Sequence, residues 1–459
     1  MRFGRGLILA VMVLLLVTTV VLAAVQVWLP VAVGLTVVAI PFLIALYRRD
    51  DVNLFIVLGA FVLISGYESG LQPEEVIYGL YFTSFLFVWY FRQTYTFRRR
   101  LVTGPEDVSV LVFGVFVVAS SSWALLFGAR VSAIVGELLV LAMLAFYFPA
   151  KEACLGNPNV SLRRFIFLFV WLGLFVFTRN LIEYLQGVHS AEYLFELMHG
   201  RVALNEILFT MPALASLVFL ISVPQWRVRF ASALIFLICL TGLILTQSRG
   251  YWVAFAFGVL ALVVLVERTA RRRLLRFAVI GLLTLGISAA LALPRVFDVF
   301  VLGIVDRVAT IGTALTTDIS MVNRMYETSA LWERIKANPI LGYGTGARFQ
   351  YWSLTFQHTT NYPFVHNAFA GLWFKYGLVG LILALFIWVR TIWSGVKLYK
   401  SKDLDLMPRI IGLSIAVCLI AEFPVANTSN PFLITDGVLV FSLFAGIASG
   451  LRQRYSNNE

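Results

Sequence analysis

Long apolar runs, separated by short polar stretches, fill most of the chain. An apolar run of about 20 residues can cross the roughly 30 Å hydrocarbon core of a bilayer as a helix, and somewhat shorter runs can cross beside other helices. Fourteen such runs lie at 7–29, 31–47, 53–66, 76–91, 108–128, 131–149, 165–182, 202–222, 229–246, 250–266, 274–293, 368–393, 409–425 and 432–450. Twelve is the alternative count, with the runs at 31–47, 53–66 and 76–91 in question. The pattern predicts an all-α fold, a polytopic membrane helical bundle of 12–14 transmembrane helices.

One long break, residues 295–365, divides this pattern into three predicted parts. Residues 1–294 form an N-terminal transmembrane bundle, 295–365 a loop region of short helices, and 366–459 the C-terminal transmembrane helices. The 71-residue loop is too short for an independent catalytic domain, but it can hold a few helices that lie over the bundle.

The loop itself carries a helix pattern and a turn pattern. Four side chains recur there at roughly helical spacing, at Met325, Thr328, Trp332 and Ile335. This spacing predicts an amphipathic helix on the surface of the bilayer or of the protein. Asn338-Pro339 ends that helix, and the glycine-rich run 342–346 predicts a turn. The run lacks the strand before it and the Gly-Lys-Ser/Thr after it that a phosphate-binding loop needs.

Composition supports a membrane location. Apolar residues make up 60% of the chain and charged residues only 13%, whereas soluble domains carry about 25% charged residues. At the N-terminus, Arg2 and Arg5 precede an apolar run that is longer than the roughly 7–15-residue core of a signal peptide. We therefore expect 7–29 to be retained as the first span, although Ala23-Ala24 is a weak signal for cleavage.

The distribution of charge predicts the orientation, because Lys and Arg accumulate in short cytoplasmic loops. With the N-terminus inside, 25 of the 36 basic residues and 9 of the 24 acidic residues fall on the inner side. The inner side then carries +16 and the outer side −4. Both termini are thus expected to be cytoplasmic in a multi-pass membrane protein, with 295–365 on the outer side. The net charge of +12 marks topology, so nucleic acid is not an expected partner.

The sequence shows no pattern of metal or disulfide chemistry. Cys154, Cys239 and Cys418 are far apart and lie in predicted spans or a cytoplasmic loop. The four histidines lack metal-ligand spacing such as His-Glu-x-x-His. Asp403-Leu404-Asp405 resembles the metal-binding Asp-x-Asp of nucleotide-sugar transferases, but it lies in a Lys-rich segment predicted to be cytoplasmic and is interpreted as a solvated surface. We expect no metal and no cofactor.

Polar residues enter the spans mainly at their predicted outer ends. A charge at the centre of a transmembrane helix costs roughly 2.5–3.5 kcal/mol, so each needs a partner, a path to water or a function. The residues concerned are Arg130, Glu137, Arg179, Glu183, Arg201, Asn205, Glu206, Arg249, Glu422 and Asp436. Arg249 occupies a break of a few residues between two spans, where a tight turn does not require an arginine. It either snorkels to lipid phosphates or binds an anion.

Three further residues are candidates for a site at this outer face. Arg201 opens the eighth span, where Glu206 could simply be its partner, and Arg324 lies on the predicted loop helix, where it could be solvated. His366 is the one histidine fused to the start of a long span. It is either an interfacial hydrogen-bonding residue or a general base, because an imidazole can take up a proton near neutral pH.

The motifs around these residues resemble the bacterial O-antigen ligases and the related O-antigen polymerases. The resemblance covers residues 201–395. It rests on the following segments: Gln247-Ser248-Arg249-Gly250; Arg324 with Trp332; Asn338-Pro339-Ile340-Leu341-Gly342-Tyr343-Gly344; and His366-Asn367 followed by Gly371, Tyr376-Gly377-Leu378 and Gly380. The stretch at Arg201 is a looser match. The combination is fairly specific, although each short motif alone is weak.

The resemblance implies a fold of the C-class glycosyltransferase type and a metal-independent enzyme at the periplasmic face. Such an enzyme transfers a glycan from undecaprenyl diphosphate to a hydroxyl of lipid A-core in ligases, or of another repeat unit in polymerases. By motif, Arg249 and Arg324 are similar to diphosphate-binding arginines, Arg201 is a looser candidate, and His366 is similar to the catalytic histidine. Family ligases have about twelve spans, whereas the sequence here predicts up to fourteen.

The same roles follow from the chemistry of the residues. Transfer from a lipid diphosphate needs a base for the hydroxyl and positive charge for the leaving group, and arginine supplies that charge bidentately. A polytopic transporter is the alternative from another class, and a membrane scaffold is a third. Transporters place their polar groups near the bilayer midplane, often in paired repeats, whereas this chain gathers them at one face and shows no repeat. The sugar, the acceptor and the oligomeric state do not follow from the sequence.

Overall fold

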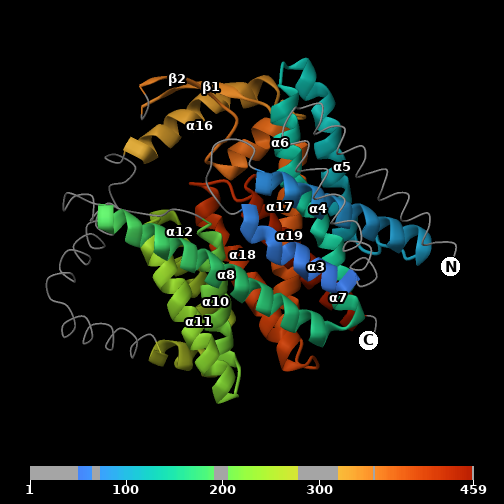
Figure 1. Ribbon diagram of the computed structural model, residues 1–459, viewed down its shortest axis with the longest axis vertical. Coiled ribbons are helices and arrows are strands. Elements are labelled where there is room, and N and C mark those ends of the chain that lie inside the picture. Colours follow the sequence, from blue (N-terminus) through green and yellow to red (C-terminus); the bar gives the residue numbers. More distant parts are fainter. Residues whose placement is uncertain (1–49, 65–72, 191–204, 278–318, 355–356, 457–459) are drawn as a thin grey trace. The chain divides into compact units, whose positions relative to one another are not determined.

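The computed structural model describes residues 50–64, 73–190, 205–277, 319–354 and 357–456 (Figure 1). The described residues are almost wholly helical, which confirms the predicted all-α membrane fold. The predicted spans 7–29 and 31–47 lie outside the described residues, as does most of 274–293. The predicted count of 12–14 spans depends on these segments and stays a prediction, as does the three-part division of the chain.

Two compact units emerge from the contacts within the chain. Unit 1 comprises Met1–Thr103 and Val160–Leu172. Its described elements are α3 (Asp50–Gly59), the 3-10 helix η1 (Ala60–Ile64), α4 (Pro73–Phe91), a short π-helix η2 (Arg92–Thr96) and part of α8 (Pro158–Ser190). Within this unit, the ring of Phe55 packs edge-on against Phe165, and Trp171 Nε1 donates to the Gly59 carbonyl at 3.3 Å. These contacts hold α3 against the first half of α8.

Unit 2 comprises Gly104–Asn159 and Gly173–Glu459 and holds every candidate residue that is described. Its helices are α5 (Pro105–Leu126), α6 (Val131–Ala142), η3 (Met143–Phe146), α7 (Tyr147–Gly156), the rest of α8, α10 (Ile207–Ser222), α11 (Trp226–Leu245), α12 (Arg249–Leu265), α16 (Ile319–Ala337), α17 (Ala368–Lys400), α18 (Leu406–Ala426) and α19 (Thr435–Ser456). Each predicted span within the described residues coincides, at least in part, with a helix of one of the two units.

Length and apolar character identify seven candidate membrane-spanning segments among the described residues. They are Pro105–Leu126, Val131–Gly156, Pro158–Gly187, Trp226–Leu245, Ala368–Lys400, Leu406–Ala426 and Thr435–Ser456. Three apolar helices are shorter, at Val52–Val62, Ile207–Ser222 and Arg249–Leu265. The chain is therefore a multi-pass helical membrane protein.

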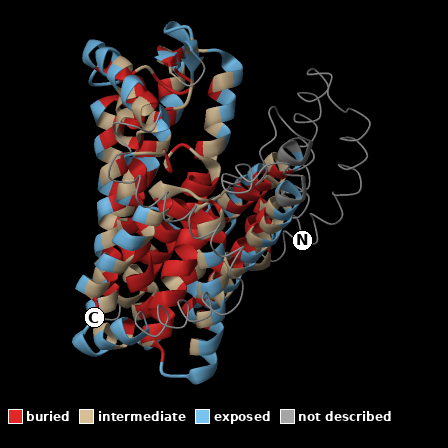
Figure 2. Cartoon of the chain, turned by 90° about the vertical axis from the view of Figure 1, so that its left-hand side faces the viewer, coloured by how far each residue is buried: buried red, intermediate tan, exposed pale blue. Residues whose placement is uncertain are grey.

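The core of unit 2 lies around α18, which packs along α10, α12 and α17. In Figure 2 the buried residues fill the interior of this bundle. Gly395 of α17 and Gly412 of α18 let the two backbones approach closely, because a Cβ on Gly395 would lie 2.5 Å from the Gly412 carbonyl oxygen. Small residues serve this purpose widely in membrane bundles, where close packing replaces a hydrophobic driving force.

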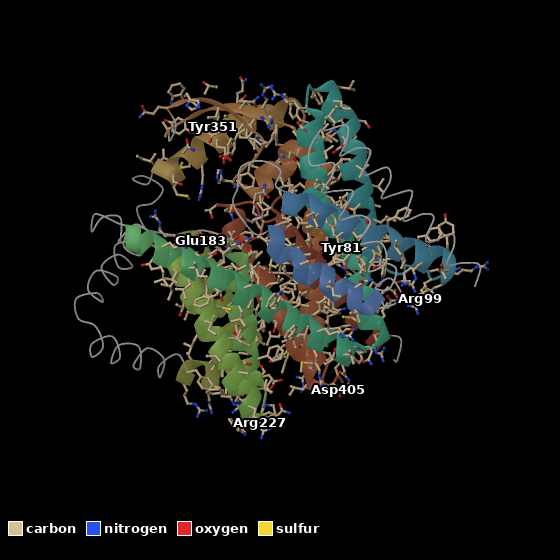
Figure 3. The ribbon with its side chains drawn as sticks, viewed as in Figure 1. Tyr81, Arg99, Glu183, Arg227, Tyr351 and Asp405 are labelled. Atoms are coloured by element: carbon tan, nitrogen blue, oxygen red, sulfur yellow. The ribbon has the colours of Figure 1, made fainter. Side chains whose placement is uncertain are left out.

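The two ends of unit 2 carry the residues that the charge count assigns to opposite sides. Arg227 and Asp405, predicted to lie inside, are at one end of the bundle in Figure 3, and Tyr351 of the loop is at the other. The end that carries Tyr351 is called the loop end below.

The described part of the loop region contains one helix and one β-hairpin, and the hairpin was not predicted. Strand β1 (Phe349–Ser353) pairs antiparallel with β2 (His358–Tyr362), and Phe349 lies opposite Tyr362. The hairpin and α16 lie together at the loop end (Figure 1). In β1, buried and exposed residues alternate, with Phe349 and Tyr351 facing inward. This alternation is what gives a hairpin one face to pack on a helix.

Helix α16 ends at Ala337, as Asn338-Pro339 predicted, but its buried face differs from the predicted stripe. The buried residues are Asn323, Glu327, Leu331 and Ile335. Of the predicted stripe only Ile335 is buried, whereas Met325 and Trp332 are exposed. The hydrophobic pattern missed this face because half of its residues are polar and find hydrogen-bond partners inside the fold.

Candidate functional site

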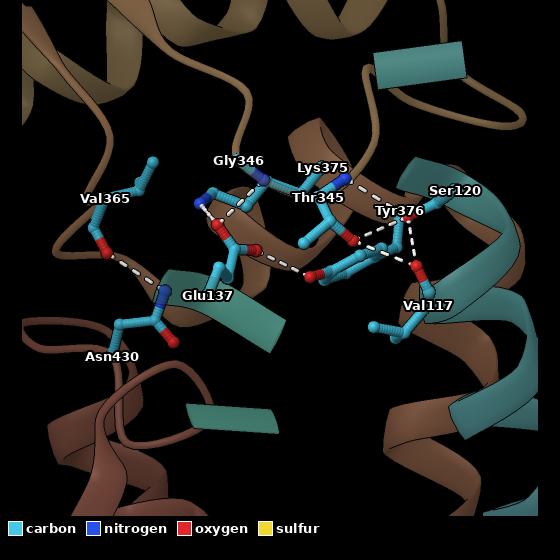
Figure 4. Close-up of polar contacts among 9 residues, drawn as sticks. All are labelled: Val117, Ser120, Glu137, Thr345, Gly346, Val365, Lys375, Tyr376 and Asn430. Atoms are coloured by element: carbon cyan, nitrogen blue, oxygen red, sulfur yellow. Dashed lines mark hydrogen bonds and ion pairs between the residues drawn. The ribbon is translucent and has the colours of Figure 1, made fainter. Parts of the chain in front are cut away.

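The N-terminus of α17 fixes the main chain on both sides of His366. Asn367 is the N-cap, and its side chain accepts a hydrogen bond from the Ala370 N–H at 3.0 Å. On the other side, Val365 is fully buried, and its carbonyl accepts from Asn430 Nδ2 at 3.0 Å (Figure 4). His366 therefore immediately precedes a long apolar helix, as the sequence predicted, on a backbone anchored at both neighbours.

Glu327 of α16 holds His366 with both of its carboxylate oxygens. Oε1 accepts the His366 backbone N–H at 2.7 Å, and Oε2 lies 2.7 Å from the imidazole Nδ1. The Glu327 side chain is wholly buried, while that of His366 is 30% exposed. Because a carboxylate only accepts hydrogen bonds, we assign the imidazole proton to Nδ1 and the lone pair to Nε2. The pair can thus accept a proton at Nε2 beside a fixed negative charge.

A mixed cluster seats α16 so that Glu327 reaches His366. Apolar residues of the helix, the hairpin and α17 form its core: Leu331, Ile335, Ala347, Phe349, Tyr351, Val365 and Phe374. Asn323 adds two hydrogen bonds on the same helix face, donating to Tyr351 Oη at 3.3 Å and accepting from the Leu354 N–H at 2.8 Å. The described part of the loop region is therefore packed as one body over the start of α17.

The glycine-rich turn joins this body to the bundle through its backbone. Gly342, Gly344 and Gly346 all have positive φ, which glycine adopts without steric cost. The Tyr343 N–H donates to the Phe374 carbonyl at 2.9 Å, and the Gly344 N–H donates to the Lys375 carbonyl at 2.6 Å. These bonds place the turn beside α17, two to three residues before the helix is broken at Gly377, which also has positive φ.

Glu137 of α6 anchors the same turn from the bundle side (Figure 4). Its carboxylate pairs with Lys375 Nζ, accepts from Tyr376 Oη at 2.6 Å, and accepts from the Gly346 N–H at 3.1 Å. Thr345 is bound beside it, where its N–H donates to Ser120 Oγ at 3.1 Å. Glu137, predicted to border the sixth span, is therefore a structural anchor with three donors.

Arg249 was predicted to occupy a break between two spans; the break between α11 and α12 is at 246–248, and Arg249 follows it as the first residue of α12. Its neighbour Gly250 packs against the turn between α18 and α19, since a Cβ there would lie 3.0 Å from Thr428 Oγ1. Asn430 of the same turn binds the carbonyl before His366. The start of α12 and the start of α17 thus both contact residues 427–434, which brings Arg249 and His366 to one end of the bundle.

Arg324 lies one helical turn before Glu327 on α16, so it is close to the histidine along the helix. Its guanidinium donates to Met321 Sδ at 3.8 Å. Arg201 lies outside the described residues, and its assignment stays a prediction. The structure therefore gathers His366, Arg249 and Arg324 at the loop end.

Several other predicted polar residues form a chain between α8 and α19. Arg179 donates to Asn205 Oδ1 at 3.0 Å, and Asn205 Nδ2 donates to Asp436 Oδ2 at 3.0 Å. Glu183 pairs with Arg179 at 3.7 Å, one turn along α8. Both residues lie within α8, which continues to Ser190.

Sequence reasoning missed Glu327 and Lys375. Lys375 had a usable signal, because an ionisable residue within a predicted span needs a partner. Glu327 had a weaker one, as it lies four residues after Asn323 and four before Leu331 on the face that became buried. Within the described residues, no group of three or more His, Cys, Asp or Glu could hold a metal ion, and the three cysteines are free and buried.

The fold and this site define a polytopic helical membrane protein with a histidine–carboxylate pair and two arginines at one end of its bundle. Residues 234–385 match the family model described as O-Antigen ligase. This match covers about a third of the chain, including Arg249, Arg324 and His366, and confirms the resemblance drawn from its motifs. Over this segment the chain is similar to the O-antigen ligase family.

A search of curated proteins gives a more distant similarity. The chain is 25% identical over 226 residues to an uncharacterized protein from Haemophilus influenzae. The aligned region covers 46% of this chain and 54% of that protein, so the chain spans about half the length of this curated relative.

Proposed function

We propose that the protein is a membrane glycosyltransferase that moves a glycan from undecaprenyl diphosphate to an acceptor hydroxyl. In its most specific form it is an O-antigen ligase that attaches O-antigen to lipid A-core in lipopolysaccharide biosynthesis. The reaction takes place at the periplasmic face of the bacterial inner membrane, with both termini in the cytoplasm. The observation that carries the proposal is the His366–Glu327 pair, which shares the loop end with Arg249 and Arg324 inside the family segment.

His366 acts as the general base in this mechanism. Nδ1–H donates to Glu327, so Nε2 can accept the proton of the acceptor hydroxyl. The hydroxyl oxygen then forms a bond to the anomeric carbon, while the bond from that carbon to the phosphate oxygen breaks. Direct displacement inverts the anomeric configuration. Glu327 stabilises the imidazolium that results, and solvent takes its proton through the exposed part of the ring.

Arg249 and Arg324 bind the diphosphate and stabilise the negative charge that grows on it as the glycan leaves. A guanidinium donates two parallel hydrogen bonds to phosphate oxygens, and it supplies this charge without a metal ion. Arg201 is assigned the same role from its motif. Stabilising charge where it develops in the transition state is commonly the largest single contribution to catalysis.

Replacing His366 in the host organism tests the function. The gene is deleted and restored as wild type, His366→Ala or His358→Ala, which removes an exposed histidine of β2 as the control. Lipopolysaccharide and carrier-linked glycan are then compared on gels. We expect His366→Ala to lose the core-attached ladder while polymer stays on undecaprenyl diphosphate, and His358→Ala to keep the ladder.

Two other outcomes would change the assignment. Accumulation of single-repeat product in the His366→Ala strain would identify a repeat-unit polymerase instead of a ligase. An unchanged glycan pattern in the deletion strain would contradict glycan transfer altogether, and a proton-coupled uptake assay in liposomes would then test the transporter alternative.

Lysine substitutions test the arginines. Arg249→Lys and Arg324→Lys keep the charge but lose the bidentate fork, so we expect the transfer rate at limiting donor to fall about 10–100-fold, the equivalent of one charge-assisted hydrogen bond. Arg348→Lys changes an exposed arginine of the same loop region and is the control. Wild-type rates in both site variants would remove the diphosphate role.

A further inference from the structure

Glu422 is a buried acid that the proposed transfer reaction does not use. It lies one turn before the end of α18, inside a candidate membrane-spanning helix, and only 4% of its surface is exposed. Neither carboxylate oxygen has a hydrogen-bond partner among the described residues. An intramembrane acid without a partner is expensive, which makes it a candidate functional site.

A small cavity of about 20 Å³ lies against this side chain. Its walls come from α10, α17, α18, α19 and the 427–434 turn, with Met211, Trp388, Pro431 and Phe441 among them. A space of roughly 10–15 Å³ is enough for one water molecule if polar partners are present. The cavity can therefore hold one water beside the Glu422 carboxyl group, but not an organic ligand.

Asp436 lies near Glu422 but, unlike Glu422, it accepts hydrogen bonds from described residues. Its Oδ2 accepts from Asn205 Nδ2 at 3.0 Å, and its Oδ1 accepts from the Gly437 N–H at 2.8 Å. Hydrogen bonds donated to a carboxylate favour its charged form, and Glu422 receives none from the described residues. Of these two neighbouring acids, Glu422 is therefore the one suited to carry a proton.

The charged groups nearest to Glu422 are also acidic. Among the described residues, Asp436 on α19 and Glu206 at the start of α10 are acidic groups close enough to act on it electrostatically. On its own helix, Cys418 lies one turn further from the loop end and contacts the Met211 carbonyl. The residues that line the cavity from α17 and from the 427–434 turn carry no charge. Arg179 is linked to Asp436 through Asn205.

We propose that Glu422 and its cavity form a proton-binding site, in which Glu422 is a neutral carboxylic acid at neutral pH that is hydrogen-bonded to one water molecule. A neutral acid avoids the large cost of an isolated charge in an apolar interior, and a single water satisfies its remaining donor and acceptor. The site lies directly beneath the turn whose Thr428 and Asn430 contact the start of α12 and the segment before α17.

Infrared difference spectroscopy of the full-length protein in nanodiscs tests the proposal directly. We expect the carbonyl stretch of a protonated carboxylic acid at neutral pH, which disappears in Glu422→Gln and persists in Glu333→Gln, a change at an exposed acid of α16. Carbon-13 labelling of glutamate carboxyl groups in the wild-type protein should shift this band. The labelled wild type keeps the test valid even if Glu422→Gln folds poorly.

Two results would overturn the proposal. A wild-type spectrum with no labelled carboxylic-acid band at neutral pH would mean that Glu422 is ionised. A band that vanishes when sodium replaces a bulky organic cation in the buffer would mean that a metal ion, not a proton, occupies the site.

Thermal unfolding provides a second readout that does not depend on enzymatic activity. If the folded protein binds a proton at Glu422 that the unfolded chain has released at neutral pH, wild-type stability falls as the pH rises. Glu422→Gln cannot titrate, so its melting temperature relative to wild type should rise steadily from about pH 6 to about pH 9. A constant difference over that range would contradict proton binding.

Discussion

Glu327 and Glu422 are both buried glutamates of unit 2, yet their surroundings are opposite. Glu327, on the loop helix, uses both oxygens on His366, whereas Glu422, inside the bundle, has no hydrogen-bond partner among the described residues. Hydrogen-bond donors offset the cost of removing a carboxylate from water, and a buried carboxylate without donors bears that cost in full. Burial alone therefore does not assign a role to an acid. The donors around it decide whether it serves as a fixed charge or as a proton carrier.

Replacing Glu327, the acid that is bound to His366, should have the largest effect on activity. Glu327→Gln keeps the shape of the side chain but removes the negative charge that orients and stabilises the imidazole. We expect kcat to fall about 10²–10⁴-fold, the usual range for a disabled acid–base group, with KM nearly unchanged. The rate–pH profile should also change shape, because an uncharged amide replaces the carboxylate that lies against Nδ1 of His366.

The matched control for this variant is Glu333→Gln, which alters an exposed acid two turns along the same helix. It should retain the wild-type rate and pH profile. A purely structural role for Glu327 would instead lower the amount of folded protein and leave the profile of the remaining activity unchanged, a result that would refute the positioning role.

Glu137 is a third acid of unit 2, and it is paired with Lys375. Lys375→Met leaves the Glu137 charge with only the Tyr376 and Gly346 donors. Breaking a buried pair costs about 3–5 kcal/mol of unfolding free energy, measured by thermal or denaturant unfolding. Lys336→Met breaks the exposed pair with Glu333 and should cost about 0–1 kcal/mol. Equal costs would show that Lys375 and Glu137 are solvated; the double variant Lys375→Met/Glu137→Gln should recover part of the loss.

Much of the fold could be predicted because hydrophobic length is a local property. The helices α5 and α17 to α19 lie where apolar runs predicted spans, and Asn338-Pro339 ends α16. The hairpin could not be predicted, since β1 and β2 are only five residues each and β2 is exposed on both faces. Its apolar residues are buried only in the folded chain, where they pack against α16 and against Phe374 of α17.

Only part of the candidate site could be predicted from the sequence. His366 and Arg249 stood out because each is a polar residue at a span boundary, which the sequence displays directly. Their shared contact with the 427–434 turn, and the bond from Glu327 to a histidine 39 positions away, depend on tertiary packing. The buried face of α16 could not be predicted from its hydrophobic pattern for the same reason. Asn323 and Glu327 are buried there with partners from distant segments.

The loop that carries Glu327 depends on its glycine turn, which gives a prediction of intermediate size. In Gly344→Ala the new Cβ would collide with the Ser120 carbonyl oxygen, at a residue with positive φ. Gly128→Ala is the control, because Gly128 has a similar positive φ but open space around it. Both variants bear about 1–2 kcal/mol of backbone strain, and Gly344→Ala should lose about 1–3 kcal/mol more in unfolding experiments. Equal losses would mean that the turn is not seated on α5.

A double-mutant cycle between Glu422 and Asn205, the partner of Asp436, should show the smallest effect. Asn205→Gly removes a donor from Asp436 and suits the positive φ of that residue, and Glu422→Leu removes the second acid without adding a donor. If Glu422 is neutral, removing it does not change the electrostatic field at Asp436. The two changes should then add, with a coupling energy below about 0.5 kcal/mol in a double-mutant cycle of unfolding free energies. An ionised Glu422 would repel Asp436, so its removal would relieve part of the Asn205→Gly cost and give a coupling of about 0.5–3 kcal/mol.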